Sequence, residues 1–120
     1  MRIFVTGIAG FIGSTVAELL RDCGHQVSGC DDLSLGRWIN VPEGIDWDVG
    51  DLRDMKAINA DVVVHLAAMS CARWPDPTEL WERNLEATVH LKSIFNGRIV
   101  FSSTCVAPDP LLGAYAGSKW

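Results

Sequence analysis

No stretch of the 120-residue sequence stays apolar for the about 18 residues that a membrane-spanning helix needs. Basic residues are also few, because ten lysines and arginines stand against fifteen acidic residues and do not gather along one segment. The formal net charge of −5 argues further against a nucleic-acid partner. Composition and pattern therefore predict neither a membrane protein nor a nucleic-acid-binding protein.

The cysteines and histidines lack the spacing of a disulfide framework or a metal site. The four cysteines contain no Cys-x-x-Cys pair, and Thr6 and Gly7 interrupt the N-terminal apolar stretch before it reaches the length of a secretory leader. The three histidines, His25, His65 and His90, fall in different predicted elements. We therefore predict reduced thiols, a cytoplasmic protein and no bound metal.

What the sequence does contain is a glycine-rich segment, TGIAGFIG at Thr6–Gly13, directly after the apolar run Ile3–Val5. An amphipathic stretch follows, so the segment predicts a strand, a tight turn and the N-terminus of a helix. In a dinucleotide site, Gly7 permits the turn, Gly10 lets the backbone approach a pyrophosphate, and Gly13 lets the helix pack close on the strand. The helix N-terminus then presents unpaired N–H groups to the phosphates.

A carboxylate further along the chain selects among dinucleotides. The predicted strand 26–30 ends at Asp31 and Asp32, and Asp31 lies 18 residues after Gly13. Dinucleotide-binding folds place an acidic residue on the adenosine ribose about 20 residues after the glycines. A free 2′-hydroxyl can donate a hydrogen bond to this carboxylate, whereas a 2′-phosphate would be repelled by it. The sequence therefore predicts NAD as the cofactor, in preference to NADP.

The first half of the chain alternates between strand and helix patterns. Apolar residues at helical spacing cover residues 11–23 and stop at Gly24, which is a favourable residue for the left-handed end of a helix. Residues 33–44 have the composition of a loop, and residues 45–49 predict a short strand.

The second half continues this alternation. Adjacent valines within residues 61–66 predict a strand that is buried on both faces, as in a parallel sheet. Asp76, Pro77 and Glu79 have the spacing of a capped helix start, and residues 98–102 predict a fifth strand after that helix. The sequence therefore predicts an α/β fold with a Rossmann-type doubly wound parallel sheet that stops after its fifth strand.

Hydroxyl groups and a Tyr–Lys pair follow the fifth predicted strand. Ser103 and Thr104 come at its carboxyl end, which is where sheets of this type bind ligands. Tyr115 and Lys119 are four residues apart, so they would share one face of a helix. A lysine ammonium beside a phenol favours the phenolate, and the pair therefore predicts a general base. The hydroxyl of Ser103 or Thr104 would orient the substrate hydroxyl.

Together these segments resemble the N-terminal part of the extended short-chain dehydrogenases/reductases, the NAD-dependent nucleotide-sugar epimerases and dehydratases that include UDP-glucose 4-epimerase. The matching segments are TGIAGFIG (6–13), DDLSLG (31–36), GDLRD (50–54), HLAA (65–68), NLEAT (84–88), SST (102–104) and YAGSK (115–119). The resemblance implies that residues 1–120 form one NAD-binding domain, without the C-terminal region that grips the nucleotide sugar in longer family members.

The resemblance also implies a set of cofactor contacts. The pyrophosphate would lie on residues 11–12, the adenosine ribose beside residues 31–36, the adenine beside residues 51–52, and the nicotinamide above residues 66–68. The implied contacts are Gly7, Gly10, Phe11, Ile12, Gly13, Asp31, Asp32, Leu33, Ser34, Gly36, Asp51, Leu52, Leu66, Ala67 and Ala68.

In the implied reaction, Tyr115, partnered by Lys119, deprotonates a sugar 4-hydroxyl while hydride leaves C4 for NAD. A 4-keto sugar results, and return of the hydride to the opposite face gives an epimer. Family dehydratases that remove the 6-hydroxyl carry Asp and Glu directly after the active-site hydroxyl, whereas Cys105 follows Thr104 here. The resemblance therefore favours an epimerase over a 4,6-dehydratase and leaves both Ser103 and Thr104 open as the third catalytic member.

Departures from the family pattern keep other interpretations open. The 12 residues from Ser103 to Tyr115 are fewer than family members use, and Trp120 follows Lys119 directly. We therefore expect the isolated chain to turn over nucleotide sugars poorly, and a non-catalytic NAD-binding module or an assembly domain remains an alternative. Residues 99–102 would also lack a neighbouring strand, which predicts self-association as a homodimer.

Overall fold

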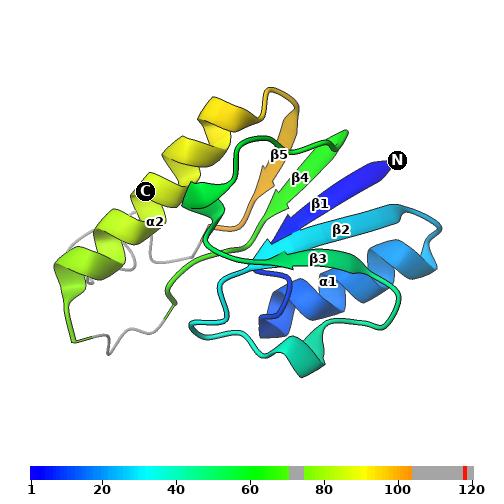
Figure 1. The fold of residues 1–120 in the computed structure, drawn as a ribbon, viewed down its shortest axis with the longest axis horizontal. Helices are drawn as coiled ribbons and strands as arrows, with labels where there is room; N and C mark the ends of the chain where they lie inside the picture. Colours follow the sequence, from blue (N-terminus) through cyan, green and yellow to red (C-terminus); the bar gives the residue numbers. More distant parts are fainter. Residues whose placement is uncertain (71–74, 104–117, 119–120) are drawn as a thin grey trace.

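The computed structural model describes residues 1–70, 75–103 and 118. Across these residues, five parallel strands form one sheet in the order β3-β2-β1-β4-β5, with helices packed against it (Figure 1). The elements are β1 (Arg2–Thr6), α1 (Phe11–Asp22), β2 (Gln26–Asp31), η1 (Trp38–Asn40), β3 (Asp46–Val49), η2 (Leu52–Asp54), β4 (Val62–His65), α2 (Pro77–Ile94) and β5 (Arg98–Phe101). The predicted fold class is confirmed.

The central strand β1 sets the position of the site. It pairs with β2 on one side and β4 on the other, so Thr6 at its carboxyl end lies between Cys30 and His65. The strand order reverses here, because β2 and β3 lie to one side of β1 whereas β4 and β5 lie to the other. Sheets of this kind bind ligands at such a reversal point, outside the carboxyl ends of the strands.

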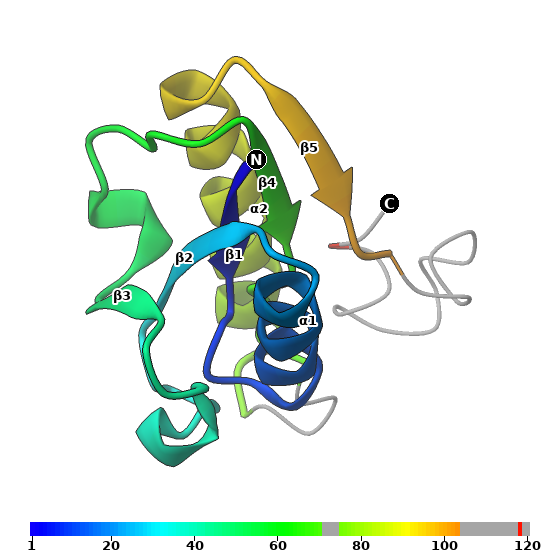
Figure 2. The ribbon, with the colours of Figure 1, turned by 90° about the vertical axis from the view of Figure 1, so that its right-hand side faces the viewer.

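The two long helices cover opposite faces of the sheet (Figure 2). Successive side chains of a strand point to opposite faces, so β1 contributes to two cores. Ile3 and Val5 pack in a cluster with Ala17 of α1, whereas Phe4 packs in a second cluster with Leu91 of α2. This burial on both faces explains why β1 and β4 read as continuous apolar runs in the sequence.

The predicted helix boundaries are confirmed by their capping geometry. Gly24, just after α1, has a φ of +84°, which is the left-handed conformation that glycine adopts without strain. At the start of α2, the Asp76 carboxylate accepts hydrogen bonds from the backbone N–H groups of Thr78 and Glu79, and Pro77 occupies the first helical turn.

Two short 3-10 helices were not predicted. Trp38–Asn40 (η1) lies within the segment predicted as loop, and Leu52–Asp54 (η2) follows β3. The Asp51 carboxylate starts η2 by accepting a hydrogen bond from the Arg53 N–H at 2.9 Å. Single turns of this length leave no periodic pattern in a sequence, because they span less than one hydrophobic repeat.

No helix within the described ranges is long and apolar enough to cross a membrane.

Candidate functional site

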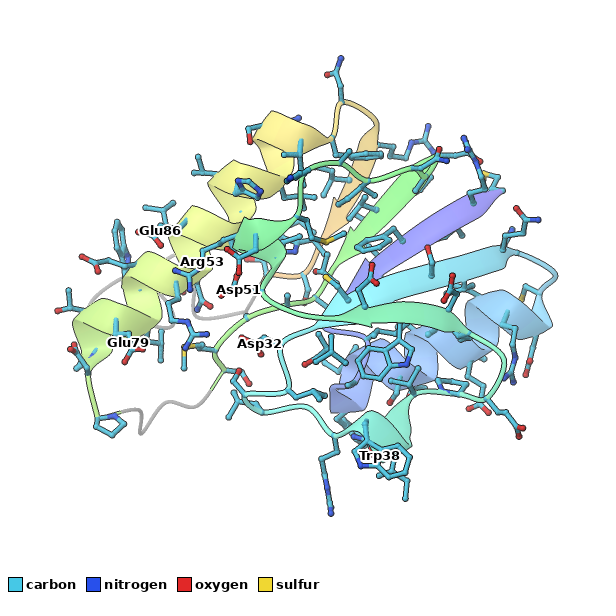
Figure 3. The ribbon with its side chains drawn as sticks, viewed as in Figure 1. Asp32, Trp38, Asp51, Arg53, Glu79 and Glu86 are labelled. Atoms are coloured by element: carbon cyan, nitrogen blue, oxygen red, sulfur yellow. The ribbon has the colours of Figure 1, made fainter. Side chains whose placement is uncertain are left out.

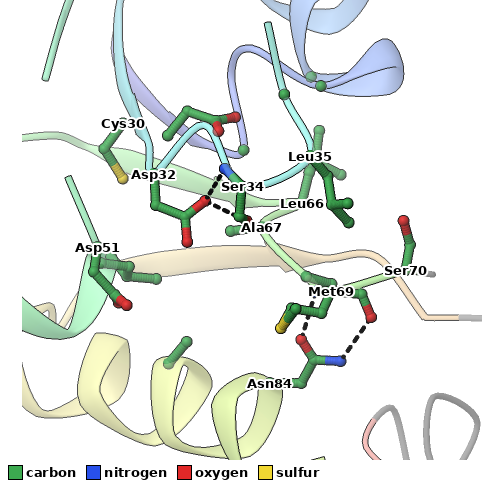
Figure 4. Close-up of a pocket in the computed structure, with 18 of the residues that line it drawn as sticks. Cys30, Asp32, Ser34, Leu35, Asp51, Leu66, Ala67, Met69, Ser70 and Asn84 are labelled. Carbon is green, nitrogen blue, oxygen red and sulfur yellow. Dashed lines mark hydrogen bonds between the residues drawn. The ribbon is translucent and has the colours of Figure 1, made fainter. Parts of the chain in front are cut away.

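A pocket of about 470 Å³ opens at the carboxyl end of the sheet, beside the reversal point at β1 (Figure 4). Its volume falls within the about 300–1,000 Å³ that is typical of small-molecule sites. The glycine turn, the loops after β2 and β3, the segment after β4 and one face of α2 all line it. Of the predicted cofactor contacts, those that line the pocket are Gly7, Gly10, Phe11, Ile12, Gly13, Asp31, Asp32, Ser34, Gly36, Asp51, Leu52, Leu66, Ala67 and Ala68. Leu33 is not among the lining residues.

Two glycines of the turn, Gly7 and Gly13, lie too close to neighbouring backbone to carry side chains. Gly7 has a φ of +75°, and a Cβ there would lie 2.8 Å from the backbone nitrogen of Ala67. A Cβ at Gly13 would overlap the carbonyl group of Gly7, so the helix packs on the turn that follows β1 rather than on the strand itself. A Cβ at Gly10 would have one neighbouring heavy atom within 4 Å, the backbone oxygen of Gly7, at a distance of 3.2 Å. The floor of the pocket at this end is therefore bare backbone.

The N-terminus of α1 faces this pocket. Gly10 is its capping residue, no side chain of the described residues caps it, and its first turn carries no acidic residue. Phe11 and Ile12 begin the helix with exposed side chains. The N–H groups of this first turn have no intrahelical partner, and the helix dipole adds partial positive charge to them. Such an end favours an anionic ligand group.

Asp31 has a structural role that sequence reasoning missed. One carboxylate oxygen accepts a hydrogen bond from the N–H of Ala9 at 2.9 Å, and the other accepts one from the N–H of Leu33 at 2.8 Å. A Cβ at Gly36 would lie 2.8 Å from the same carboxylate, and Asp31 is only 8% exposed. Asp31 therefore holds the glycine turn and the loop after β2 together. A carboxylate has about four acceptor positions, so capacity remains for a ribose hydroxyl.

Asp32 lies on the pocket side of this loop. Its Oδ1 accepts hydrogen bonds from the Ser34 backbone N–H at 2.9 Å and from the Ser34 hydroxyl at 2.6 Å (Figure 4). Its Oδ2 accepts a hydrogen bond from Nη2 of Arg83 at 3.0 Å, across 51 residues of sequence. Arg83 extends from α2 and also lines the pocket. An arginine beside Asp32 was not predicted.

An ion-pair chain closes the adenine side of the predicted site (Figure 3). Nη2 of Arg53 lies 2.7 Å from Oδ2 of Asp51, and its Nη1 lies 2.7 Å from Oε2 of Glu86 on α2. The hydrogen bond from the Arg53 side chain lowers the pKa of Asp51 below its ordinary value, and burial opposes this shift only in part. Asp51 therefore stays ionised where the loop after β3 meets α2.

A buried hydrogen-bond network fixes the segment after β4. The hydroxyl of Thr6 lies 2.7 Å from Nδ1 of His65, and its oxygen accepts hydrogen bonds from the N–H groups of Leu66 at 3.2 Å and Ala67 at 3.1 Å. Thr6 is fully buried and His65 is 1% exposed. The single threonine hydroxyl thus orients the backbone that lines the predicted nicotinamide end.

The other side of the His65 ring defines its tautomer. The Thr88 hydroxyl donates to the carbonyl of Asn84 at 3.0 Å, so the same hydroxyl receives a hydrogen bond from Nε2 of His65, also at 3.0 Å. Nδ1 then accepts the proton of the Thr6 hydroxyl. With the proton on Nε2 and none on Nδ1, the hydrogen-bond network fits a neutral imidazole that links β1, β4 and α2.

Asn84 connects three parts of the chain. Its side-chain oxygen accepts from the N–H of Met69 at 2.7 Å, and its amide nitrogen donates to the Met69 carbonyl at 3.3 Å (Figure 4). The same nitrogen donates to the hydroxyl of Ser118 at 2.9 Å. The pocket wall after β4, helix α2 and Ser118 therefore meet at this 5% exposed residue. The motif NLEAT marked the residue, but no role was assigned to it.

The predicted catalytic residues are described only in part. Tyr115, Lys119 and Thr104 lie outside the described residues. Ser103 follows β5 and is exposed, whereas the preceding residue, Ser102, lines the pocket. Within the described ranges, no three His, Cys, Asp or Glu side chains are grouped so that they could hold a metal ion.

Comparisons with known proteins agree with this geometry. Residues 3–113 match the model of a family described as the NAD dependent epimerase/dehydratase family. A UDP-glucose 4-epimerase of Streptomyces lividans is 34% identical over 117 residues, which cover 86% of this chain and 36% of that protein. A CDP-glucose 4,6-dehydratase of Salmonella typhimurium is 30% identical over 104 residues, which cover 75% of this chain and 29% of that protein.

A solved structure gives the same result for the fold. The UDP-glucose 4-epimerase of Thermus thermophilus, in complex with NAD, superposes with a TM-score of 0.81 and 29% identity, over 99% of this chain and 47% of that one. The chain thus spans less than half the length of these relatives. The resemblance inferred from the motifs is confirmed, and the chain belongs to the NAD dependent epimerase/dehydratase family.

Proposed function

We propose that this chain binds NAD in the pocket at the carboxyl end of its sheet. The observation that carries the proposal is the meeting in one cavity of glycine backbone, two aspartates and a helix N-terminus that no side chain of the described residues caps. The pyrophosphate would accept hydrogen bonds from the first turn of α1, above Gly10. Asp31 and Asp32 would accept hydrogen bonds from the adenosine ribose, and their charge favours NAD over NADP.

The remaining predicted contacts complete the proposed binding mode. Asp51 and Leu52, after β3, would flank the adenine, and residues 66–68 would lie under the nicotinamide. The Thermus thermophilus relative was solved with NAD, which supports this cofactor for the present chain. The residues fit the group because every predicted contact except Leu33 lines one pocket. The bound cofactor would supply a hydride acceptor for the oxidation of a substrate alcohol.

We propose a nucleotide sugar as the substrate and 4-epimerisation as the reaction. In this proposal Tyr115 takes the proton of the sugar 4-hydroxyl, Lys119 favours the phenolate, and Ser103 or Thr104 orients the hydroxyl. The Streptomyces lividans relative supports an epimerase. The Salmonella typhimurium relative supports a 4,6-dehydratase as the second candidate, but the sequence after Thr104 lacks the acidic pair expected for it. A non-catalytic NAD-binding module remains the alternative from another functional class.

We further propose that the chain forms a homodimer in the cytoplasm. Among the described residues, β5 pairs with β4 alone, and Val100 and Phe101 on it are 51% and 40% exposed. An edge strand with exposed apolar side chains can pair with another copy of itself. Light scattering at micromolar concentration tests this proposal, and a stable monomer contradicts it.

Titration calorimetry with NAD and NADP tests the cofactor proposal. We expect one saturable site per chain and tighter binding of NAD than of NADP. Gly10→Val should abolish binding of both, because its side chain would occupy the pocket above the turn. Equal or tighter binding of NADP would contradict the preference, and unchanged binding by Gly10→Val would contradict the site.

The turnover of nucleotide sugars by the isolated chain is tested separately from cofactor binding. We expect the isolated chain to convert UDP-glucose and UDP-galactose poorly, since it spans only 36% of the Streptomyces lividans relative. Product separation after long incubation tests this, with Tyr115→Phe as the matched variant. Sustained conversion that Tyr115→Phe abolishes would support the proposed base and contradict the expected inactivity.

A further inference from the structure

Arg83 places a positive charge inside the proposed adenosine end of the pocket. It extends from α2, its side chain is 24% exposed, and it lines the pocket together with Asp31 and Asp32. Carboxylates from three segments lie within 4 Å of the guanidinium: Asp32 after β2, Asp51 after β3 and Glu79 on α2 itself. Figure 3 labels these three acidic residues.

Among these three carboxylates, Asp32 is the principal partner of Arg83. The Nη2–Oδ2 distance to Asp32 is 3.0 Å, whereas the distances to Asp51 and Glu79 are 3.9 and 3.6 Å. Asp51 is already engaged by Arg53, which donates to both of its carboxylate oxygens. Loss of the Asp32 charge would therefore remove the closest of the ion pairs described for Arg83.

The second arginine of the pocket differs in this respect. Arg53 is held by Asp51 on one side and by Glu86 on the other, each at 2.7 Å. Removal of Glu86 would still leave Arg53 bound to both oxygens of Asp51. Among the ion pairs of the described residues, Arg83 thus has one carboxylate within 3.5 Å, that of Asp32, whereas Arg53 has two. Asp32 follows β2, where the adenosine ribose binds in this fold.

The balance between Asp32 and Arg83 bears directly on the ribose 2′ position. A 2′-phosphate needs a cation and is repelled by nearby carboxylates, whereas a 2′-hydroxyl needs an acceptor. Asp31 contributes less to the discrimination between a 2′-hydroxyl and a 2′-phosphate than its place after β2 suggests. It is nearly buried, and its carboxylate already accepts hydrogen bonds from the N–H groups of Ala9 and Leu33. Asp32 is more accessible and neutralises the guanidinium of Arg83, which lies within hydrogen-bond distance of it.

We propose that the Asp32–Arg83 pair determines whether the site discriminates against a 2′-phosphate. In this proposal Arg83 is a potential phosphate-binding group, and its ion pair with Asp32 keeps it from binding the phosphate. This inference rests on the proposed NAD site. With the pair intact, a 2′-phosphate must displace Asp32 from Arg83. Without the Asp32 charge, Arg83 is available to bind the phosphate through charge-assisted hydrogen bonds.

Calorimetric titration of the 120-residue chain with NAD and NADP tests the inference. In Asp32→Asn, we expect the ratio of the Kd for NADP to the Kd for NAD to fall about tenfold or more, since one hydrogen bond to a charged group is gained by the phosphate. The double variant Asp32→Asn/Arg83→Gln should lose this gain. Glu86→Gln, which releases one partner of the other arginine, is the matched control and should keep the wild-type ratio.

The possible outcomes separate this inference from the proposed function. A wild-type chain that binds neither dinucleotide contradicts the NAD site itself. A wild-type chain that binds NAD, together with a folded Asp32→Asn variant of unchanged ratio, contradicts only the role of the pair. A gain in NADP binding that persists in the double variant would also overturn it, because Arg83 would then not be the phosphate-binding group. Adenosine 2′,5′-bisphosphate and AMP probe the adenosine end of the site alone. The ratio of their Kd values should rank the variants in the same order as the ratio for NADP and NAD.

Discussion

Asp31 and Ala9 are joined by a 2.9 Å hydrogen bond from the Ala9 N–H to Oδ2 of the carboxylate, 22 residues apart in the sequence. This bond ties the end of β2 to the glycine turn after β1, and the second oxygen of Asp31 holds the loop that follows. The residue proposed to bind the ribose therefore also shapes the backbone proposed to bind the pyrophosphate.

The first prediction concerns this double role. Asp31→Ala should lower the free energy of unfolding by about 1–3 kcal/mol, because two backbone N–H groups lose their acceptor in a nearly buried position. Asp32→Ala should cost less, since Asp32 bonds the more accessible Ser34 and Arg83. Urea unfolding of both variants measures the difference, and an Asp31→Ala chain as stable as wild type would contradict the structural role.

The glycine turn gives a second prediction. Gly13→Ala should prevent stable folding or strongly destabilise the chain, because its Cβ would overlap the backbone of Gly7. Gly50→Ala is the matched control, since a Cβ there would have no heavy atom within 4 Å and its φ is not in the left-handed region. Thermal unfolding followed by circular dichroism tests the pair. Equal midpoints for the two variants would show that the helix can move away from the turn at little cost.

The buried Thr6 hydroxyl gives a third prediction. Thr6→Val keeps the shape of the side chain but removes the partner of His65 and the side-chain acceptor for the Leu66 and Ala67 N–H groups. We expect a loss of about 2 kcal/mol or more, because the Ala67 N–H loses its Thr6 acceptor and Nδ1 of His65 loses its Thr6 donor in a buried site. The Leu66 N–H keeps the Thr6 backbone carbonyl as an acceptor. Thr6→Ser retains the hydroxyl and should recover most of this loss in urea titrations. A valine variant as stable as the serine variant would argue against the network.

The fourth prediction concerns stability in acid. The folded-state pKa of Asp51 lies below its ordinary value of 3.8, chiefly because of the hydrogen bond from Arg53. The stabilisation from this pair is therefore present above the unfolded-state pKa and is lost as the pH falls through the lower folded-state pKa. Arg53→Gln should reduce the loss of stability below about pH 4.

Urea unfolding measured from neutral to acidic pH provides the test of this effect. Arg98→Gln is the matched control, because Arg98 makes no ion pair among the described residues and should leave the acid slope unchanged. If Arg53→Gln has the same acid slope as wild type, Asp51 does not contribute to it.

Local signals in the sequence predicted the fold well. The glycine spacing, the valine run of β4 and the capped start at Asp76 each act over a few residues, and the structure has the corresponding turn, strand and helix. These signals are readable because each lies in residues that are close together in the sequence: glycines for a turn, an apolar run for a strand buried on both faces, and a side chain that caps a helix.

The side-chain contacts of the site were less predictable. The Asp32–Arg83 bond spans 51 residues, and the Thr6–His65 bond spans 59. Such pairs depend on which strands become neighbours, and no spacing rule along the chain encodes them. The predicted cofactor contacts, except Leu33, nevertheless line one pocket, because most of them follow strands whose carboxyl ends meet at one edge of the sheet.

Binding of NAD in the pocket around the glycine turn can be followed residue by residue through the backbone amide chemical shifts during an NAD titration. We expect saturable shifts concentrated at Gly7, Gly10, Asp32, Leu52 and Ala67, which line the pocket from four different segments. Amides at the opposite end of the sheet, such as Gln26 and Arg98 at the starts of β2 and β5, should stay unchanged. An absence of shifts at millimolar NAD, or shifts confined to residues outside the pocket, would contradict the binding of NAD at this site.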